Sequence, residues 1–295
     1  MRRLAITTAT TALVLAASAT FATPADAMRE RGPATSARGG LKCPIGVVGF
    51  DSGHHIRSDD FTNGRLEQSR TSAKTLPFDV TAFGYFDSSG TSKRNRLRLN
   101  VVASDGIPRN VTLKRTRHSV KIGKVKKYQD RSFTPRLYAD GGTFYAYVLN
   151  GGTLKRWSLS RYPNGDVRYA QPAKVRGRLG DLTSLQAASY TEVHGVASEI
   201  LYATNSGGQL LQIVVPLKHP SKARVHKLAA SGYEGVTELS WSLCNNKGDY
   251  HTLIAIDPVG NRATWTTIKH AFTRPKSKLQ GAVTGVSDWN LSAGF

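Results

Sequence analysis

Four carboxylates stand at positions from which they could perform acid–base chemistry. Asp79, Asp181, Glu238 and Asp288 each lie at or in a segment that we expect to be the first strand of a repeated unit. If such strands line a central channel, a pair of these acids would serve as general acid and nucleophile in a glycoside hydrolase. However, Asp79, Asp181 and Asp288 occupy the same repeat position, where a recurring acid is more simply a turn residue. The hydrolase is therefore an alternative and not the leading hypothesis.

Locally encoded catalytic and metal-binding motifs are absent. The sequence contains no G-x-S-x-G, H-E-x-x-H, P-loop or C-x-x-C motif. His54 and His55 are followed by Asp59 and Asp60, but adjacent residues of a strand point to opposite faces and cannot readily share a metal. We expect these histidines to lie in a solvated turn, and we predict neither a metal nor a cofactor. The segment 190–194 (YTEVH) is a weaker candidate for a site on a connecting loop.

Positive charge is concentrated in one short segment. Between residues 93 and 127 the chain carries twelve Lys or Arg residues and a single acid, Asp105. The candidate binding residues among them are Arg94, Arg96, Arg98, Lys114, Arg115, Arg117, Lys121, Lys124, Lys126 and Lys127. This density predicts a polyanion-binding surface, although lysines on exposed outer strands also discourage edge-to-edge aggregation.

The whole chain is strongly cationic, with a formal net charge of +21. Its possible partners are acidic envelope polymers, acidic glycans, anionic lipid surfaces and released nucleic acid, among which electrostatics alone does not choose. The basic segment lacks clear aromatic interleaving, which argues against a platform for single-stranded nucleic acid. We do not expect sequence-specific recognition of nucleic acid.

Two patterns recur along the chain with one period. The first is a small or acidic residue, an apolar residue and Thr or Asn, and its copies begin at Asp79, Ser132, Asp181, Gly235 and Asp288. The second is an apolar strand followed by a polar turn closed by glycine, at Gly53, Gly106, Gly152, Gly208 and Gly260. Both series have a period of about 52 residues, which is the size of a four-stranded propeller blade.

The phase of the repeat predicts how the ring closes. The chain begins at a glycine hairpin with no first strand before it, and it ends at a first-strand pattern, 288–295, with no hairpin after it. We therefore predict an all-β, five-bladed propeller in which N-terminal and C-terminal strands share one blade, so that no sheet edge is left exposed.

Residues 1–27 have the features of a secretory signal peptide. Arg2 and Arg3 precede an apolar and small-residue stretch that ends at Ala25-Asp26-Ala27, a small-x-small cleavage signal. Residues 28–40 read as a disordered leader, and 41–295 as a single propeller domain without a transmembrane segment. We expect a secreted protein, extracellular or associated with the cell wall.

The chain has two cysteines, Cys43 and Cys244, which in an exported protein are candidates for one disulfide. The repeat places Cys244 between the first two strands of the last full blade and Cys43 just before the second strand of the closing blade. A bridge would therefore join neighbouring blades near the seam of the ring. The alternative is two separate buried thiols.

The hairpins FYAYVLNGGTLKRWSL (144–159) and ILYATNSGGQLLQIVVPL (200–217) resemble blades of the tachylectin-like β-propellers. That resemblance implies a five-fold disc that binds sugars. Three hypotheses follow, in this order: a non-catalytic, lectin-like module for glycans or anionic cell-envelope polymers, a module that binds an extracellular protein such as a protease, and a glycoside hydrolase.

Overall fold

A computed structural model describes residues 42–51, 53–90, 94–127, 135–140, 145–161, 167–177, 179–244 and 247–284. The chain divides into two units, 1–39 and 40–295, and every described residue belongs to the second. The expected signal peptide and leader therefore lie outside the described residues.

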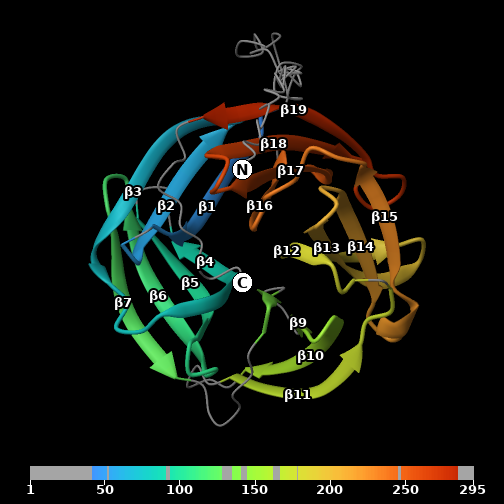
Figure 1. Cartoon of the computed structure of the whole chain (residues 1–295), viewed down its shortest axis with the longest axis horizontal. Coiled ribbons are helices and arrows are strands. Elements are labelled where there is room, and N and C mark those ends of the chain that lie inside the picture. Colours follow the sequence, from blue (N-terminus) through green and yellow to red (C-terminus); the bar gives the residue numbers. More distant parts are fainter. Residues whose placement is uncertain are drawn as a thin grey trace, which may run out of the picture. The chain divides into compact units, whose positions relative to one another are not determined.

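The described residues form five antiparallel sheets, which we number as blades 1 to 5 (Figure 1). Blade 1 contains β1 (Pro44–Phe50), β2 (His55–Thr62) and β3 (Arg65–Thr75). Blade 2 contains β4 (Val80–Gly90), β5 (Arg94–Ala103), β6 (Pro108–Thr116) and β7 (Val120–Lys127). Blade 3 contains β8 (Leu137–Asp140), β9 (Tyr145–Asn150), β10 (Thr153–Arg161) and β11 (Val167–Lys174). Blade 4 contains β12 (Leu182–Val193), β13 (Val196–Asn205), β14 (Leu210–Pro216) and β15 (Arg224–Ala229), with a short 3₁₀ turn at Pro220–Lys222. Blade 5 contains β16 (Glu238–Cys244), β17 (Lys247–Asp257), β18 (Arg262–Lys269) and β19 (Lys276–Thr284).

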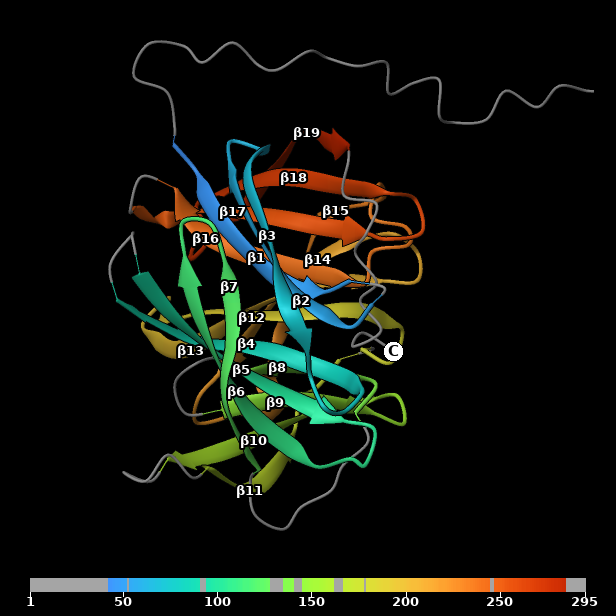
Figure 2. The same cartoon turned by 90° about the vertical axis from the view of Figure 1, so that its left-hand side faces the viewer.

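The blades follow one another around a ring, as Figures 1 and 2 show from two directions. Successive inner strands β4, β8, β12 and β16 contact one another, β16 contacts β1, and the outer strands β3 and β7 meet. The prediction of an all-β, five-bladed propeller is confirmed. The strand that should complete blade 1, beginning at Asp288, lies outside the described residues.

Glycine hairpins join the second and third strands of the blades, as the repeat predicts. In blades 2, 3 and 4 the closing glycine itself adopts a positive φ, at Gly106, Gly152 and Gly208. In blade 5 the positive φ falls instead on Asn261 (φ 48°), in a turn where the Gly260 amide donates a hydrogen bond to the Asp257 carboxylate (2.8 Å). Blade 1 repeats this arrangement with His54 (φ 62°) after Gly53.

Face-to-face stacking of the blades buries both sides of many strands. In β13 the residues from Ile200 to Ala203 are fully buried, and alternate side chains enter different apolar clusters. Leu201 packs toward blade 3, whereas Ile200 and Tyr202 pack toward blade 5. Burial of each such side chain contributes roughly 1.5–3 kcal/mol, so the apolar cores between blades hold the ring together.

One contact recurs between neighbouring blades. The backbone carbonyl in the turn after the third strand accepts a hydrogen bond from a side chain of the preceding blade. The three described examples are Arg70 to Arg117 (3.0 Å), Arg156 to Leu217 (2.7 Å) and Gln212 to Ala271 (2.9 Å). These bonds tie blades 2, 4 and 5 each to the blade before it.

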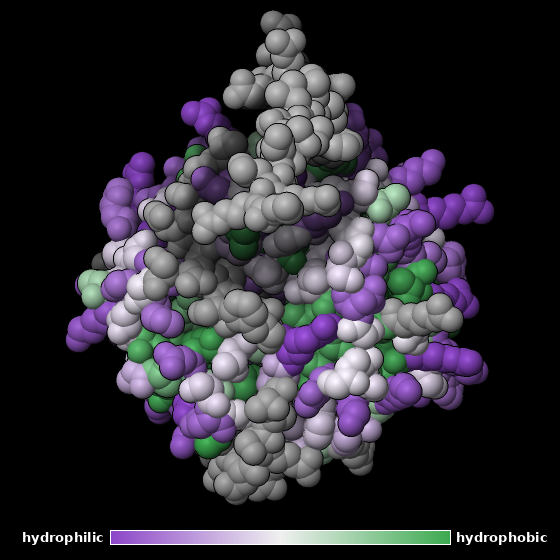
Figure 3. Space-filling model, in the orientation of Figure 1, coloured by the Kyte–Doolittle hydropathy of each residue, from purple (hydrophilic) through white to green (hydrophobic). Residues whose placement is uncertain are grey.

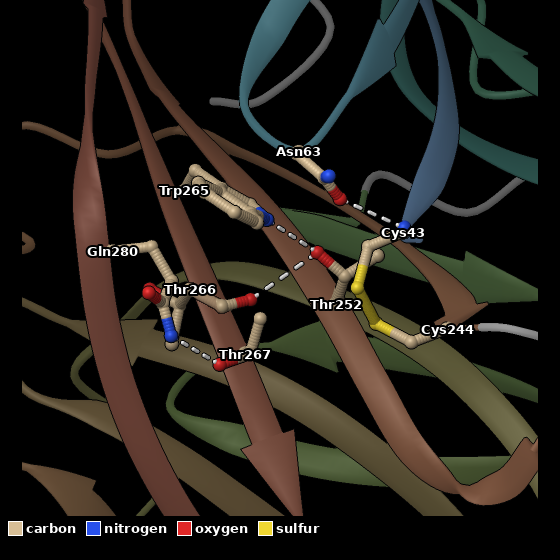
Figure 4. The surroundings of a disulfide bond; sticks show 8 residues. All are labelled: Cys43, Asn63, Cys244, Thr252, Trp265, Thr266, Thr267 and Gln280. Carbon is tan, nitrogen blue, oxygen red and sulfur yellow. Dashed lines mark hydrogen bonds between the residues drawn. A yellow bond between two sulfur atoms is a disulfide. The ribbon is translucent and has the colours of Figure 1, made fainter. Parts of the chain in front are cut away.

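The predicted disulfide is confirmed. Cys43 and Cys244 are bonded and fully buried, and they join the start of β1 in blade 1 to the end of β16 in blade 5 (Figure 4). The Cys43 amide donates a hydrogen bond to the Asn63 side chain (2.9 Å), which ties the bridge to the turn between β2 and β3. The bond therefore links two blades that are far apart in sequence.

Candidate functional site: a cationic blade face

The strand register of blade 2 places basic residues directly opposite one another. Arg96 of β5 pairs with Lys114 of β6, and Lys114 pairs in turn with Lys121 of β7. Neighbouring strands are about 4.8 Å apart, so the three side chains form a row across the blade. All three are exposed.

A fourth cation extends this row along the strand. Arg98 follows Arg96 by two residues, so both side chains lie on the same side of the sheet, and Arg98 is exposed. We call Arg96, Arg98, Lys114 and Lys121 the cationic blade face. Lys126 of β7, which pairs with Asn110, lies on the same side.

The shape of the ring explains why this face is open. On the other side of the same strands, Leu97, Leu99 and Leu113 are buried against blade 1. On the cationic side, the described part of blade 3 packs against only one end of β5. The apolar contact with blade 3 is made near Val102, beyond which the arginines of β5 remain in solvent.

The four cations of this face form no ion pair with any acid in the described part of the chain. Two other arginines of blade 2 are neutralised. Arg109 binds Asp105, and this contact, together with the Ile107 amide, holds the pKa of the Asp105 carboxyl far below its usual value. Arg115 binds Asp60 of blade 1. The four residues of the face therefore lack an acidic partner among the described residues, whereas some other basic residues of blade 2 have one.

Arg115, Arg117, Lys124 and Lys127 lie apart from the face, whereas the side chain of Arg94 is outside the described part of the structure. Arg115 points toward blade 1, where it shares Asp60 with the buried Arg70 (2.8 Å). Arg117 is exposed in the turn after β6, and Lys124 and Lys127 are exposed on the outermost strand. Arg94 stands in β5 opposite Thr116. The structure thus brings together four of the ten candidate residues, with Lys126 on the same side.

The cross-strand row carries a cost in stability. Like charges directly opposite one another in a sheet destabilise it, by a few tenths to about 1 kcal/mol per pair. The Arg96–Lys114 and Lys114–Lys121 pairs both have this arrangement. An unfavourable row of this kind is relieved when an anion binds across it.

The candidate carboxylates do not converge within the described part of the chain. Asp79 and Asp181 are exposed before β4 and β12, and their backbone carbonyls accept hydrogen bonds from Ser104 and Ser206, both at 3.0 Å. These bonds involve the backbone and not the carboxylates, so the turn role of the recurring acid stays a prediction. Glu238 alone among them reaches an interior cavity, and Asp288 lies outside the described residues.

That cavity has a volume of about 520 Å³ and lies between blades 1, 2, 4 and 5. Residues of β1, β4 and β16 line it, together with Gln186 of β12 and Asp60. Glu238 retains partial exposure because it lines the cavity, yet the surrounding protein desolvates its carboxyl and raises its pKa well above the usual value. Asp60, the other acid there, is already held by two guanidinium groups.

His54 lies in the turn between β1 and β2, whereas His55 is the first residue of β2 and is half-buried. His54 is exposed, and His55 is bound through its backbone amide to the Asp51 carboxylate (2.8 Å). No group of three or more His, Cys, Asp or Glu side chains that could hold a metal occurs among the described residues. Asp59 is fully buried inside blade 1, where its carboxylate accepts a hydrogen bond from Arg57.

Comparisons with known proteins give similarity at the level of whole structures. No protein-family model matches the chain, and no curated protein matches it. A fucose-specific lectin from Aleuria aurantia has a TM-score of 0.44 at 7% identity, over 86% of this chain and 80% of that one. The SapL1 lectin in complex with alpha methyl fucoside gives 0.37 at 10% identity, over 83% of each chain. The WD40 domain of SCAP from fission yeast gives 0.33 at 13% identity, over 76% of this chain and about half (52%) of that one. Values this low support no statement about what this chain binds.

Proposed function

We propose that this protein is an exported, non-catalytic binding module whose cationic blade face captures anionic polymers such as acidic glycans or anionic cell-envelope polymers. The observation that carries the proposal is the exposed row Arg96–Lys114–Lys121, which has no acidic partner among the described residues. Folding alone gives no reason for this row, because opposed cations destabilise the sheet. A chain of anions lying across the three strands would neutralise it.

Export is supported by two features. The signal-peptide pattern occupies residues 1–27, and a buried disulfide is typical of proteins that mature in an oxidising compartment. No helix in the described part of the chain is long and apolar enough to cross a membrane. A module with these features would meet its polymer outside the cell or within the cell wall.

The direct test replaces the whole cationic blade face. A variant with Arg96→Gln, Arg98→Gln, Lys114→Gln and Lys121→Gln should lose most of its affinity for polyphosphate, a sulfated glycan and a uronic-acid glycan. Binding is followed by isothermal titration calorimetry at several salt concentrations. Each lost contact should reduce the slope of log affinity against log salt by about one, so the slope should fall by about four.

A matched control removes the same charge elsewhere. Arg65, Arg176, Lys227 and Lys278 are exposed on other parts of the ring, so changing all four to Gln removes two arginines and two lysines without touching the face. This control should bind like the unmodified protein. If both variants lose affinity equally, net charge alone drives binding and the proposal is wrong.

A further inference from the structure

A second cationic surface lies on the turns that join the third and fourth strands. Segments 117–119, 217–223 and 270–275, in blades 2, 4 and 5, contain no Asp or Glu. Their exposed basic residues are Arg117, Lys218, Lys222 and Arg274, and exposed Arg224 and Lys276 begin the strands that follow. We call these six residues the turn face.

The three turns lie on one side of the ring. Each joins the third and fourth strands of an antiparallel four-stranded sheet, and in each a turn carbonyl, at Arg117, Leu217 or Ala271, accepts a hydrogen bond from a side chain of the preceding blade. Because the first strand of each of these sheets is innermost and neighbouring strands are antiparallel, the turn between the third and fourth strands lies at the same end of every sheet. The basic side chains of blades 2, 4 and 5 are therefore presented in one direction from different sectors of the ring. Figure 3 shows one face of the molecule, with hydrophilic side chains around much of its outer rim.

Of the acids at this end of the sheets, Glu192 is exposed in the hairpin between β12 and β13, whereas Asp249 is hydrogen-bonded. Asp249 of β17 binds the ring of His270 (3.1 Å). In blade 5, Lys269 and Lys276 stand directly opposite each other across β18 and β19, and both are exposed. The unfavourable pairing of like charges thus recurs next to the turn, far from the cationic blade face in sequence.

We propose that the turn face docks the protein flat on an anionic lipid bilayer. A linear polymer that follows one blade reaches only that blade's cations, whereas a planar array of lipid headgroups meets the turns of all three blades together. Basic residues near an anionic bilayer each contribute favourably to binding. This inference does not depend on the cationic blade face and goes beyond capture of a polymer.

A neighbouring hairpin adds apolar contact at the same end of the sheet. Because strands alternate in direction, the turn between β12 and β13 lies on the same side as the turn between β14 and β15. Near its tip Tyr190 and Val196 are 52% and 49% exposed, and the turn itself is formed by His194 and Gly195, both with positive φ. An exposed tyrosine beside basic turns suits the headgroup region of a bilayer, where aromatic side chains with a polar end are favoured.

The test is flotation of the full mature chain with vesicles. Vesicles of phosphatidylcholine containing phosphatidylserine should bind the protein, and vesicles of phosphatidylcholine alone should not. A variant with Lys218→Gln, Lys222→Gln and Arg224→Gln should lose about fivefold in affinity per residue, or roughly a hundredfold together. Circular dichroism and thermal melting confirm that the variant folds.

The two proposals fail in distinguishable ways. The blade 4 variant should keep its affinity for polyphosphate, whereas the fourfold variant of the cationic blade face should still float with anionic vesicles. If the unmodified protein binds polyphosphate but not anionic vesicles, or if the blade 4 variant floats like the unmodified protein, docking through the turn face is refuted. If it binds anionic vesicles but no acidic polymer, only the function proposed for the blade face is refuted.

Discussion

Replacing Lys114 with Glu should stabilise the protein and at the same time weaken its binding to acidic polymers. Lys114 stands between two cations, Arg96 and Lys121, at the distance of neighbouring strands. The substitution converts two repulsive cross-strand pairs into two attractive ones. With a few tenths to about 1 kcal/mol per pair, the free energy of unfolding should rise by about 1–2 kcal/mol at low salt.

For a domain of this size, about 1 kcal/mol corresponds to roughly 2–4 °C in melting temperature. The expected increase for Lys114→Glu is therefore about 2–8 °C, measured by differential scanning calorimetry. In about 1 M salt the Debye length falls to about 3 Å, so most of the gain should disappear. Affinity for polyphosphate should fall in the same variant, because the polymer meets an anion at the centre of the row.

The control for this variant is Lys227→Glu, which makes the same change of charge on an exposed strand of blade 4. Lys227 faces Leu211 across the sheet, so no like-charge pair is relieved. Lys227→Glu should leave both the melting temperature and polymer binding nearly unchanged. If Lys114→Glu melts no higher than Lys227→Glu at low salt, the cations of the row do not repel each other as argued.

Three further predictions concern the seam and interior of the ring. Changing Cys43 and Cys244 together to Ser removes a cross-link between residues 201 positions apart. The free energy of unfolding, measured by denaturant titration, should fall by about 3–5 kcal/mol. Asp60→Asn leaves the guanidinium groups of Arg70 and Arg115 without their shared carboxylate. The free energy of unfolding should fall by about 1–3 kcal/mol, and an unchanged denaturation midpoint would contradict this role of Asp60. In the folded protein the pKa of Glu238 is raised, so above about pH 4.5 the unfolded chain loses the proton of this carboxyl while the folded chain keeps it. The free energy of unfolding of the unmodified protein therefore falls as pH rises, and Glu238→Gln removes this effect. The variant and the unmodified protein should therefore differ little near pH 4, and the variant should be the more stable near pH 8.

The architecture could be predicted from the sequence because each blade repeats the same local signals. Glycine hairpins at a period of about 52 residues specify strand pairs, and strands apolar on both sides specify stacking between blades. The disulfide was a candidate because an exported chain with two cysteines allows one pairing, and the phase of the repeat placed it between neighbouring blades. The residue with positive φ was not predicted in blade 5, where it is Asn261 and not the closing glycine Gly260.

The candidate site could be derived from the sequence only in outline. The density of Lys and Arg between residues 93 and 127 indicated a basic blade, and the alternation in β5 would place Arg96 and Arg98 on one side. Register could not be read from composition, so the alignment of Lys114 with Lys121 was not foreseen. The pairing of Arg115 with Asp60 was also missed, because it joins residues 55 positions apart in different blades.

The salt dependence of polymer binding tests the central claim most directly. Calorimetric titration of the unmodified protein with polyphosphate at about 50 and 200 mM salt should show a loss of affinity of roughly a hundredfold, as four released counterions require. The fourfold variant of the cationic blade face should show almost no dependence on salt. An affinity of the unmodified protein that stays constant over this range would contradict the claim that Arg96, Arg98, Lys114 and Lys121 form the binding surface.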